Sequence, residues 1–275
     1  MLRGKRWVMG YLFVLLAVSM AVSALGWIYF IYFFSIGYGF GIAALAVAIA
    51  AMFHEVMTLP MALVCLVMFV FGCRLGLYLL TREKRSDAYK KILYGPEASK
   101  KKPLGVVIVV WIFCALLYVG QVSPASFYLA NAEAGKDVSP FVAWVGMFIM
   151  FAGVLLEATA DMQKASAKTL HPGRFVSSGL YKIVRCPNYL GELVIWTGSF
   201  VLCFGAHCAL WQWVIAAMGY AGIIYVMFSG ARRLELRQNQ VYGDNPDYKA
   251  YVKKTPLLIP LVPIYSLAKC EWLKA

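Results

Sequence analysis

The chain has 275 residues, of which 62% are hydrophobic and only 14% are charged. A mean hydropathy of +0.71 excludes a soluble globular domain, in which charged residues make up about a quarter of the chain. The formal net charge of +13 lies mainly in loops and tails, where membrane topology and anionic lipid headgroups account for it without nucleic-acid binding.

Apolar runs that could cross a bilayer follow one another along the chain. A spanning helix needs about 20 mostly apolar residues. We expect the first run to be retained, because it is too long for a signal peptide and further spans follow it. The sequence therefore predicts an all-α, polytopic transmembrane helical bundle of about seven spans, as one membrane domain over residues 1–275. The runs are 7–34, 38–80 (long enough for two spans), 104–120, 138–158, 190–204 and 209–230.

Basic residues mark the loops predicted to lie in the cytoplasm. Lys and Arg concentrate in residues 82–102, 164–185 and 232–274, whereas residues 121–137 and 206–208 contain almost none. The positive-inside rule therefore places the first three segments, including the C-terminal tail, in the cytoplasm and the other two on the opposite side.

The amino terminus carries conflicting signals. Arg3, Lys5 and Arg6 favour the cytoplasm, whereas three spans before the basic loop that begins at residue 82 would place this end outside. The basic loops further along the chain favour the outside for the amino terminus and outweigh these three residues, but the orientation of the amino terminus stays open. A compact chain without a targeting extension favours a bacterial inner membrane.

Two polar residues interrupt the second apolar run. His54 and Glu55 could supply an acid to a reaction, because ionisable groups at membrane depth usually face a cavity or a ligand. They could equally mark a short loop between the second and third spans.

A polar stripe leaves the membrane after the run that ends at residue 158. Glu157, Asp161, Lys164 and Lys168 are spaced four, three and four residues apart, which aligns them on one helical face. They form either a solvated, salt-paired helix end or part of a site. Residues 170–178, with a His-Pro-Gly sequence, break this helix into a loop.

The segment from Arg185 to Glu192 is the leading candidate site. Pro187 suits the first turn of a new helix, and Asn188 and Glu192 then share one face. The free N–H groups of a helix start attract anions, and Arg185 adds a positive charge, so a phosphate-bearing ligand fits. Alternatively, Arg185 anchors to lipid phosphates and Glu192 pairs with a basic residue of another helix.

The last span ends in charged residues. Arg232 and Arg233 are either snorkelling anchors or, with Glu235, the completion of a charged cytoplasmic pocket beside the Arg185 segment. Tyrosines at 242, 248 and 251 are expected to pack the tail against the membrane face, as structural and not catalytic residues.

Cysteine and histidine are not arranged as metal ligands. The seven cysteines are scattered, mostly within spans, and the three histidines lie far apart. The cysteines are interpreted as small core residues, and no metal site is predicted.

These motifs together resemble the DUF1295 group of the steroid 5-alpha-reductase-like superfamily, over residues 72–260. The joint pattern is more specific than any of its parts. It comprises Arg74-Leu-Gly-Leu-Tyr78, Gln121-x-x-Pro124, Asp161-x-Gln163, Gly179-Leu-Tyr181, Arg185-x-Pro187-Asn188-Tyr189-x-Gly191-Glu192, Glu235, Tyr248-x-x-Tyr251 and Ile259-Pro260.

The resemblance implies a reductase that takes NADPH from the cytoplasm and a lipid-like or steroid-like substrate from the bilayer. Hydride would pass to an activated carbon–carbon double bond, as in 3-oxo-5-alpha-steroid 4-dehydrogenases. The catalytic candidates are Glu55 and Tyr78. The cofactor-binding candidates are Arg74, Asp161, Arg185, Asn188, Tyr189, Glu192, Arg232 and Arg233.

Two positions depart from the family pattern. Cys186 stands where the wider family often has histidine. Phe71 stands where steroid reductases have a tyrosine one turn before the arginine matched by Arg74. Phenylalanine cannot donate a hydrogen bond, so another residue, with Glu55 a candidate, must polarise the substrate.

An S-adenosylmethionine-dependent methyltransferase is the alternative. Isoprenylcysteine carboxyl and phospholipid methyltransferases have a related Gly-x-Tyr-x-x-x-Arg-His-Pro-x-Tyr-x-Gly stretch and a comparable tail, and a shared fold does not separate the two functions. Asn188, Glu192, the Asp161-x-Gln163 pair and the missing histidine favour the reductase.

Overall fold

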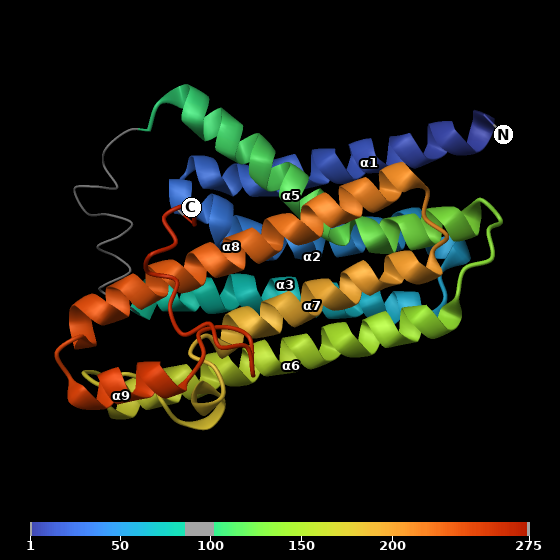
Figure 1. Ribbon diagram of the computed structural model, residues 1–275. Coiled ribbons are helices and arrows are strands. Elements are labelled where there is room, and N and C mark those ends of the chain that lie inside the picture. The colour runs from blue at the N-terminus through green and yellow to red at the C-terminus, as the bar shows by residue number, and fades with distance from the viewer. Residues whose placement is uncertain (1, 86–101, 274–275) are drawn as a thin grey trace. The chain divides into compact units, whose positions relative to one another are not determined.

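The computed structural model describes residues 2–85 and 102–273, which form helices joined by turns, with no strand among them (Figure 1). This confirms the predicted all-α class for those residues. The α-helices are α1 (Leu2–Ser23), α2 (Ile36–Met52), α3 (Leu59–Arg85), α5 (Leu104–Glu133), α6 (Pro140–Leu170), α7 (Pro187–Gly205), α8 (Leu210–Tyr242) and α9 (Pro246–Lys254). Short 3₁₀ turns are η1 (Ala24–Trp27), η2 (Phe30–Phe34), η3 (His54–Val56) and η4 (Gly179–Lys182).

Five of the described helices are long and apolar enough to cross a membrane, namely α1, α3, α5, α6 and α8, and α2 is a shorter apolar helix. The chain is therefore an integral membrane protein. The total of seven spans and the side of the C-terminus remain predictions. Most of the predicted cytoplasmic loop 82–102 falls on residues 86–101, outside the described part of the chain.

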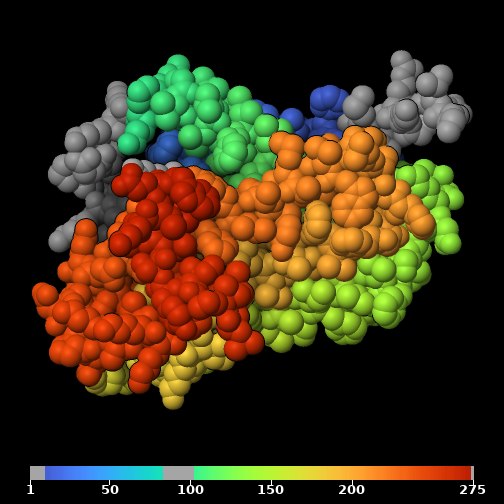
Figure 2. Space-filling model, in the orientation of Figure 1, coloured from blue at the N-terminus to red at the C-terminus, as the bar shows by residue number. Residues whose placement is uncertain are grey.

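The structure forms two compact units. Unit 1 comprises residues 1–147 and 199–220, and unit 2 comprises residues 148–198 and 221–275. Helices α6, α7 and α8 each contribute to both. In unit 2 the carboxy-terminal residues, red in Figure 2, lie against the later half of α8, where Arg232 Nη2 donates to the Ala268 carbonyl over 3.2 Å.

Glycines allow α2 and α3 to meet backbone to backbone in unit 1. A Cβ on Gly39 would lie 2.7 Å from the Gly76 nitrogen, and a Cβ on Gly72 would lie 2.4 Å from the Gly39 carbonyl oxygen. Small residues are the usual means of close helix contact in membranes. The long run 38–80 thus folds as two helices with the turn η3 between them.

The structure corrects the predicted loop at residues 121–137, because α5 continues as a helix to Glu133. Pro124 lacks an N–H, so the Gly120 carbonyl loses its helical partner. The Ser123 hydroxyl donates to that carbonyl over 2.8 Å. A side chain thereby satisfies the freed group, as membrane helices require.

Candidate functional site

The start of α7 is fixed by its contact with α6 in unit 2. A Cβ on Gly191 would lie 2.7 Å from the Glu157 nitrogen, and a Cβ on Gly153 would lie 2.6 Å from the Ile195 nitrogen. Backbone atoms cannot move aside as a flexible side chain can, so glycine is needed at both positions. The contact places Glu157 beside the turn of α7 that carries Glu192.

The polar stripe on α6 is buried where it meets α7. Glu157 is 3% exposed and Asp161 is 6% exposed, so a fully solvated helix end is wrong for these two residues. Glu157 was not predicted as a site residue, although its spacing of four residues from Asp161 indicates that the two share a helical face. Further along, Lys168 Nζ donates to the Arg174 carbonyl over 2.6 Å and ends the stripe at the loop.

The loop before α7 is tied to α6 by residues of the family motifs. Gln163 Oε1 accepts a hydrogen bond from the Leu180 N–H over 2.8 Å. Gly179 has φ +59, and a Cβ there would lie 2.4 Å from Gln163 Oε1, so the position needs glycine. The Tyr251 hydroxyl donates to the Tyr181 carbonyl over 2.6 Å. The Asp161-x-Gln163 and Gly179-Leu-Tyr181 motifs therefore also shape this loop.

Aromatic packing holds α9 against the same loop. Phe175 stacks on Tyr251 with ring centroids 5.4 Å apart, and it contacts Tyr248 and Tyr242 edge-on. Burial raises the pKa of both Tyr248 and Tyr251, so these hydroxyls stay protonated and act as hydrogen-bond donors. The three tail tyrosines therefore pack on the loop residue Phe175, and their packing against the membrane face remains a prediction.

Arg185 is a buried connector between three segments of unit 2. Its side chain pairs with Glu235 on α8, with 3.1 Å between Nη2 and Oε1 and both side chains 1% exposed. The same Nη2 donates to the Tyr265 carbonyl, while Glu235 Oε2 accepts from the Leu267 N–H over 2.8 Å. The alternative of a lipid-phosphate anchor is wrong, because the guanidinium is enclosed by protein.

Several buried polar atoms near this ion pair have no hydrogen-bond partner among the described residues. The contact between Tyr189 and Gly230, at 3.3 Å from a Cβ position on the glycine, brings the first turn of α7 to this part of α8. A buried polar group left unsatisfied costs about 1–3 kcal/mol, so a polar ligand would stabilise the cluster. Its atoms are Arg185 Nε and Nη1, Asn188 Oδ1, Ser229 Oγ and Arg232 Nε.

The remaining cofactor candidate on α8 points elsewhere. Arg233 is exposed, whereas the preceding residue Arg232, about 100° away round the helix, is partly buried. Arg185, just before α7, contacts Glu235 of α8, and Tyr189, in the first turn of α7, contacts Gly230, so both lie against the part of α8 that carries Arg232. Asn188 and Glu192 lie in the first two turns of α7, and Asp161 lies one turn beyond Glu157 on α6.

The catalytic candidates belong to unit 1 and are far apart there. Arg74 and Tyr78 lie one turn apart on α3, whereas Glu55 is exposed in η3, before α3 begins at Leu59. The length of α3 between Leu59 and Tyr78 is about 29 Å at 1.5 Å per residue. The structure does not bring Glu55 and Tyr78 together, and their catalytic roles remain predictions.

A hydroxyl missed from the sequence lies beside Phe71. The ring of Tyr38 packs edge-on against Phe71 with centroids 6.2 Å apart, and its hydroxyl accepts from Gln121 Nε2 over 3.4 Å. Tyr38 is 7% exposed. It was not found from the sequence because only the glycine contact between α2 and α3 brings it next to Phe71.

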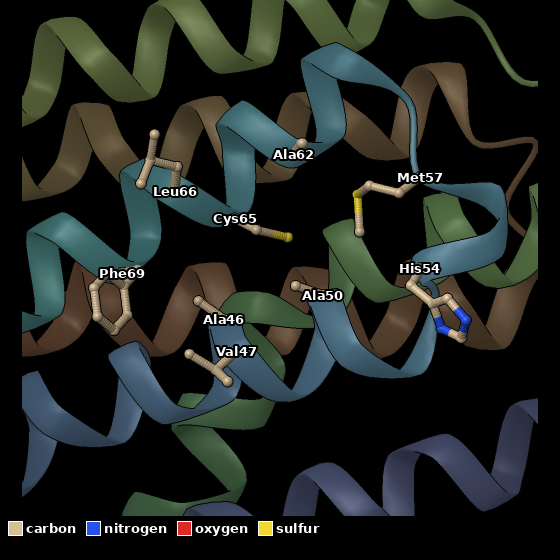
Figure 3. Close-up of a pocket in the computed structure, with 9 residues that line it drawn as sticks. All are labelled: Ala46, Val47, Ala50, His54, Met57, Ala62, Cys65, Leu66 and Phe69. Carbon is tan, nitrogen blue, oxygen red and sulfur yellow. The ribbon is translucent and has the colours of Figure 1, made fainter.

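A separate apolar groove runs between α2 and α3 (Figure 3). Its volume is about 350 Å³. In Figure 3, Cys65 and Met57 point into the space between the helices and His54 lies at one end. His54 and Cys65 are the ionisable side chains among the lining residues, and the rest of the lining is apolar. The lining consists of Ala46, Val47, Ala50, His54, Met57, Ala62, Cys65, Leu66 and Phe69.

Residues 32–255 match the family described as "Protein of unknown function (DUF1295)". The chain therefore belongs to the DUF1295 family, as its motifs predicted. It is also 23% identical over 139 residues to "Steroid 5-alpha-reductase DET2" of Arabidopsis thaliana. That alignment covers 49% of this chain and 46% of the relative, so the chain spans about half the length of the curated protein that it matches. No solved structure matches the chain.

Proposed function

We propose that this protein is a membrane-embedded oxidoreductase that uses NADPH to reduce an activated carbon–carbon double bond of a lipid-like or steroid-like substrate. The single observation that carries the proposal is the cluster of buried, unpartnered polar atoms where the first turn of α7 meets α8. The similarity to a steroid 5-alpha-reductase supports the reaction class. We place the C-terminus of the enzyme in the cytoplasm, on the basis of its charge distribution.

The donor set at α7 and α8 fits a phosphorylated nucleotide. Arg185 and Arg232 have unsatisfied N–H groups that suit phosphate oxygens. Asn188 Oδ1 is an unsatisfied acceptor that suits a carboxamide N–H or a ribose hydroxyl. Glu192 on α7 and Asp161 on α6 are further buried acceptors. When bound, NADPH supplies the hydride, and the protein orients the groups and excludes water.

Reduction of a polarised double bond also needs a hydrogen-bond donor for the activating carbonyl and a proton. In unit 1 we assign this role to the hydroxyl of Tyr38, which lies beside Phe71, with Tyr78 as the second candidate. A phenol can donate both a hydrogen bond and a proton. This assignment answers the lack of a hydroxyl at position 71.

A thermal-shift titration of the purified chain in detergent, with NADPH, NADH and S-adenosylmethionine in parallel, tests the proposal. A ligand that binds only the folded state raises the melting temperature with its concentration. We expect stabilisation by NADPH alone. Stabilisation by S-adenosylmethionine alone would contradict the proposal and support a lipid methyltransferase.

A further inference from the structure

The last part of the carboxy-terminal tail, residues 264–273, lies against the buried ion pair of unit 2 (Figure 2). This segment contains neither helix nor strand. Arg185 Nη2 donates to its Tyr265 carbonyl, and its Leu267 N–H donates to Glu235 Oε2 over 2.8 Å. Backbone groups of the tail thus bond to both partners of the ion pair, whose side chains are each 1% exposed.

The same segment continues along α8 toward the earlier part of that helix. The Ala268 carbonyl accepts from Arg232 Nη2 over 3.2 Å, and the Trp272 carbonyl accepts from the Tyr225 hydroxyl over 3.4 Å. The two residues of α8 in these bonds are about 10 Å apart along the helix axis. The segment therefore bonds to both arginines of the polar cluster, Arg185 and Arg232.

Few side chains fasten this segment to the rest of unit 2. Of residues 264–273, only Leu267 and Leu273 are buried, whereas Trp272 is 72% exposed. The hydrogen bonds described above all use backbone groups of the segment. A segment with few buried apolar contacts opens locally at a much lower cost than the core of a protein. We therefore expect it to detach while α8 stays folded.

The loop that precedes the segment has the features of a hinge. Before this loop the chain is fixed, because the carbonyls of Pro256 and Leu257 accept from the N–H groups of Arg185 and Cys186, both over 2.9 Å. Within the loop, Leu261 is fully exposed and has φ 64, in the left-handed region that residues other than glycine adopt at a cost. Backbone strain of this kind is concentrated at ligand clamps and switch regions.

We propose that residues 264–273 form a strap, which opens at the Leu261 loop to admit a nucleotide to the polar cluster and then closes over it. This inference rests on the proposed function. Arg185 is 2% exposed, so a phosphate group cannot reach its guanidinium while the strap is in place. Closure after binding separates the site from water, as lids do in many enzymes.

The strap and the nucleotide can be bound at the same time. The strap occupies one nitrogen of each arginine, Arg185 Nη2 and Arg232 Nη2. Arg185 Nε and Nη1 and Arg232 Nε have no hydrogen-bond partner among the described residues, and such donors suit phosphate oxygens. The closed strap therefore positions both guanidinium groups for the ligand and does not compete with it.

Amide hydrogen exchange of the full-length protein in detergent, without nucleotide, tests the opening. The Leu267 amide exchanges only when its bond to Glu235 breaks, whereas the amides of residues 225–235 lie within α8. We expect Leu267 to exchange at least about tenfold faster than those helical amides, yet more slowly than in an unstructured peptide. Exchange as slow as in α8, or as fast as in the peptide, would overturn the proposal, because the strap would then never open or never close.

A chain shortened to end at Pro263 tests what the strap covers. Phenylglyoxal modifies accessible arginine side chains, so its reaction measures access without any nucleotide. We expect Arg185 and Arg232 to react about tenfold faster in the shortened chain, a factor that corresponds to the loss of one or two hydrogen bonds. Arg233, which is already exposed, should react equally in both chains. Unchanged reaction of Arg185 and Arg232 in a shortened chain that melts cooperatively would overturn the proposal, and the exchange measurement decides if that chain does not fold.

The kinetics of NADPH binding separate this inference from the proposed function. We expect NADPH to associate with the shortened chain about tenfold faster than with the full-length protein, because no opening step precedes binding. Equal association rates for the two folded proteins would overturn the role of the strap in admitting the nucleotide. Failure of NADPH to bind either protein would instead contradict the proposed function, while the two measurements without nucleotide still decide whether the strap opens and what it covers.

Discussion

At the residue scale, Arg185 and Asn188 differ in how much of their hydrogen-bonding capacity the protein uses. Arg185 has one nitrogen shared between Glu235 and the Tyr265 carbonyl, and its other two nitrogens have no partner among the described residues. Asn188 Oδ1 is wholly unsatisfied. Asn188 is thus free to serve a ligand, whereas Arg185 also holds the fold together.

Asn188→Ala should weaken NADPH binding without unfolding the protein. The loss of one hydrogen bond is worth about 1 kcal/mol, which corresponds to about a fivefold rise in Kd, and Glu192→Ala should have at least as large an effect. Kd from the NADPH titration and the melting temperature without ligand are the measurements. Gln240→Ala, at an exposed position on α8, is the control. Unchanged affinity in both variants would remove these residues from the site.

Tyr38→Phe should lower turnover more than it changes NADPH affinity. The substitution removes only the hydroxyl and keeps the ring packed against Phe71, so the loss reports on proton donation or polarisation, worth about 10²–10⁴ in rate for a general acid. NADPH oxidation with a panel of conjugated lipid enones provides the assay. Glu55→Gln is the matched comparison, and loss of turnover there with normal turnover in Tyr38→Phe would return the role to Glu55.

Arg185→Leu should lower the melting temperature strongly, because it leaves Glu235 buried and unpaired. Breaking one side of a buried pair costs about 3–5 kcal/mol, whereas replacing both partners costs much less. The double variant Arg185→Leu/Glu235→Leu should therefore melt above Arg185→Leu alone. A double variant that is no more stable than the single one would show that the ion pair is not the principal contact of Arg185.

At the element scale, α6 and α7 form the scaffold of the site through a glycine contact. Helix amphipathicity has little role here, because the surfaces that face lipid are as apolar as those that face other helices. Close approach decides the pairing instead, through Gly153 and Gly191. The same device joins α2 to α3 in unit 1, where it brings Tyr38 to Phe71.

Gly191→Ala should destabilise the protein by about 1–3 kcal/mol through overpacking and should also weaken NADPH binding. The added methyl group would meet backbone atoms of Glu157 at 2.7 Å and 2.9 Å, so α6 and α7 would have to separate. Gly173→Ala is the control, since a Cβ there has open space around it. Equal melting temperatures for the two variants would contradict the close contact.

At the scale of the whole molecule, the protein comprises two compact units that share three helices. All of the candidate cofactor residues except Arg74 lie in unit 2, which is built from parts of α6, α7 and α8 with the carboxy-terminal tail. The apolar groove and Tyr38 belong to unit 1. Ligand binding to unit 2 should consequently change amide hydrogen exchange locally and not along the whole chain.

Amide hydrogen exchange measured with and without NADPH tests this expectation. Protection should be concentrated in residues 185–192 and 229–235, because a ligand that satisfies buried donors and acceptors there suppresses local opening. The turn at residues 203–208 should exchange equally in both states and serves as the internal control. Uniform protection along the chain, or none in these two segments, would contradict the proposed site.

The sequence by itself determined the membrane class, the family, the break between α2 and α3, and the start of α7 at Pro187. These features depend on local hydrophobicity, on proline and glycine, or on short motifs. The tertiary structure decided what those patterns could not. Helix α5 continues past Pro124 because Ser123 replaces the lost hydrogen bond.

The sequence likewise did not predict the ion pair between Arg185 and Glu235 or the contact between Tyr38 and Phe71. Each depends on groups brought together by close helix packing or by a reversal of the chain, and local sequence encodes neither the packing distance nor the direction of the turn. Residue types and spacing predict which side chains could act. Only the folded chain decides which of them meet, because burial and partner choice are properties of the packed helices.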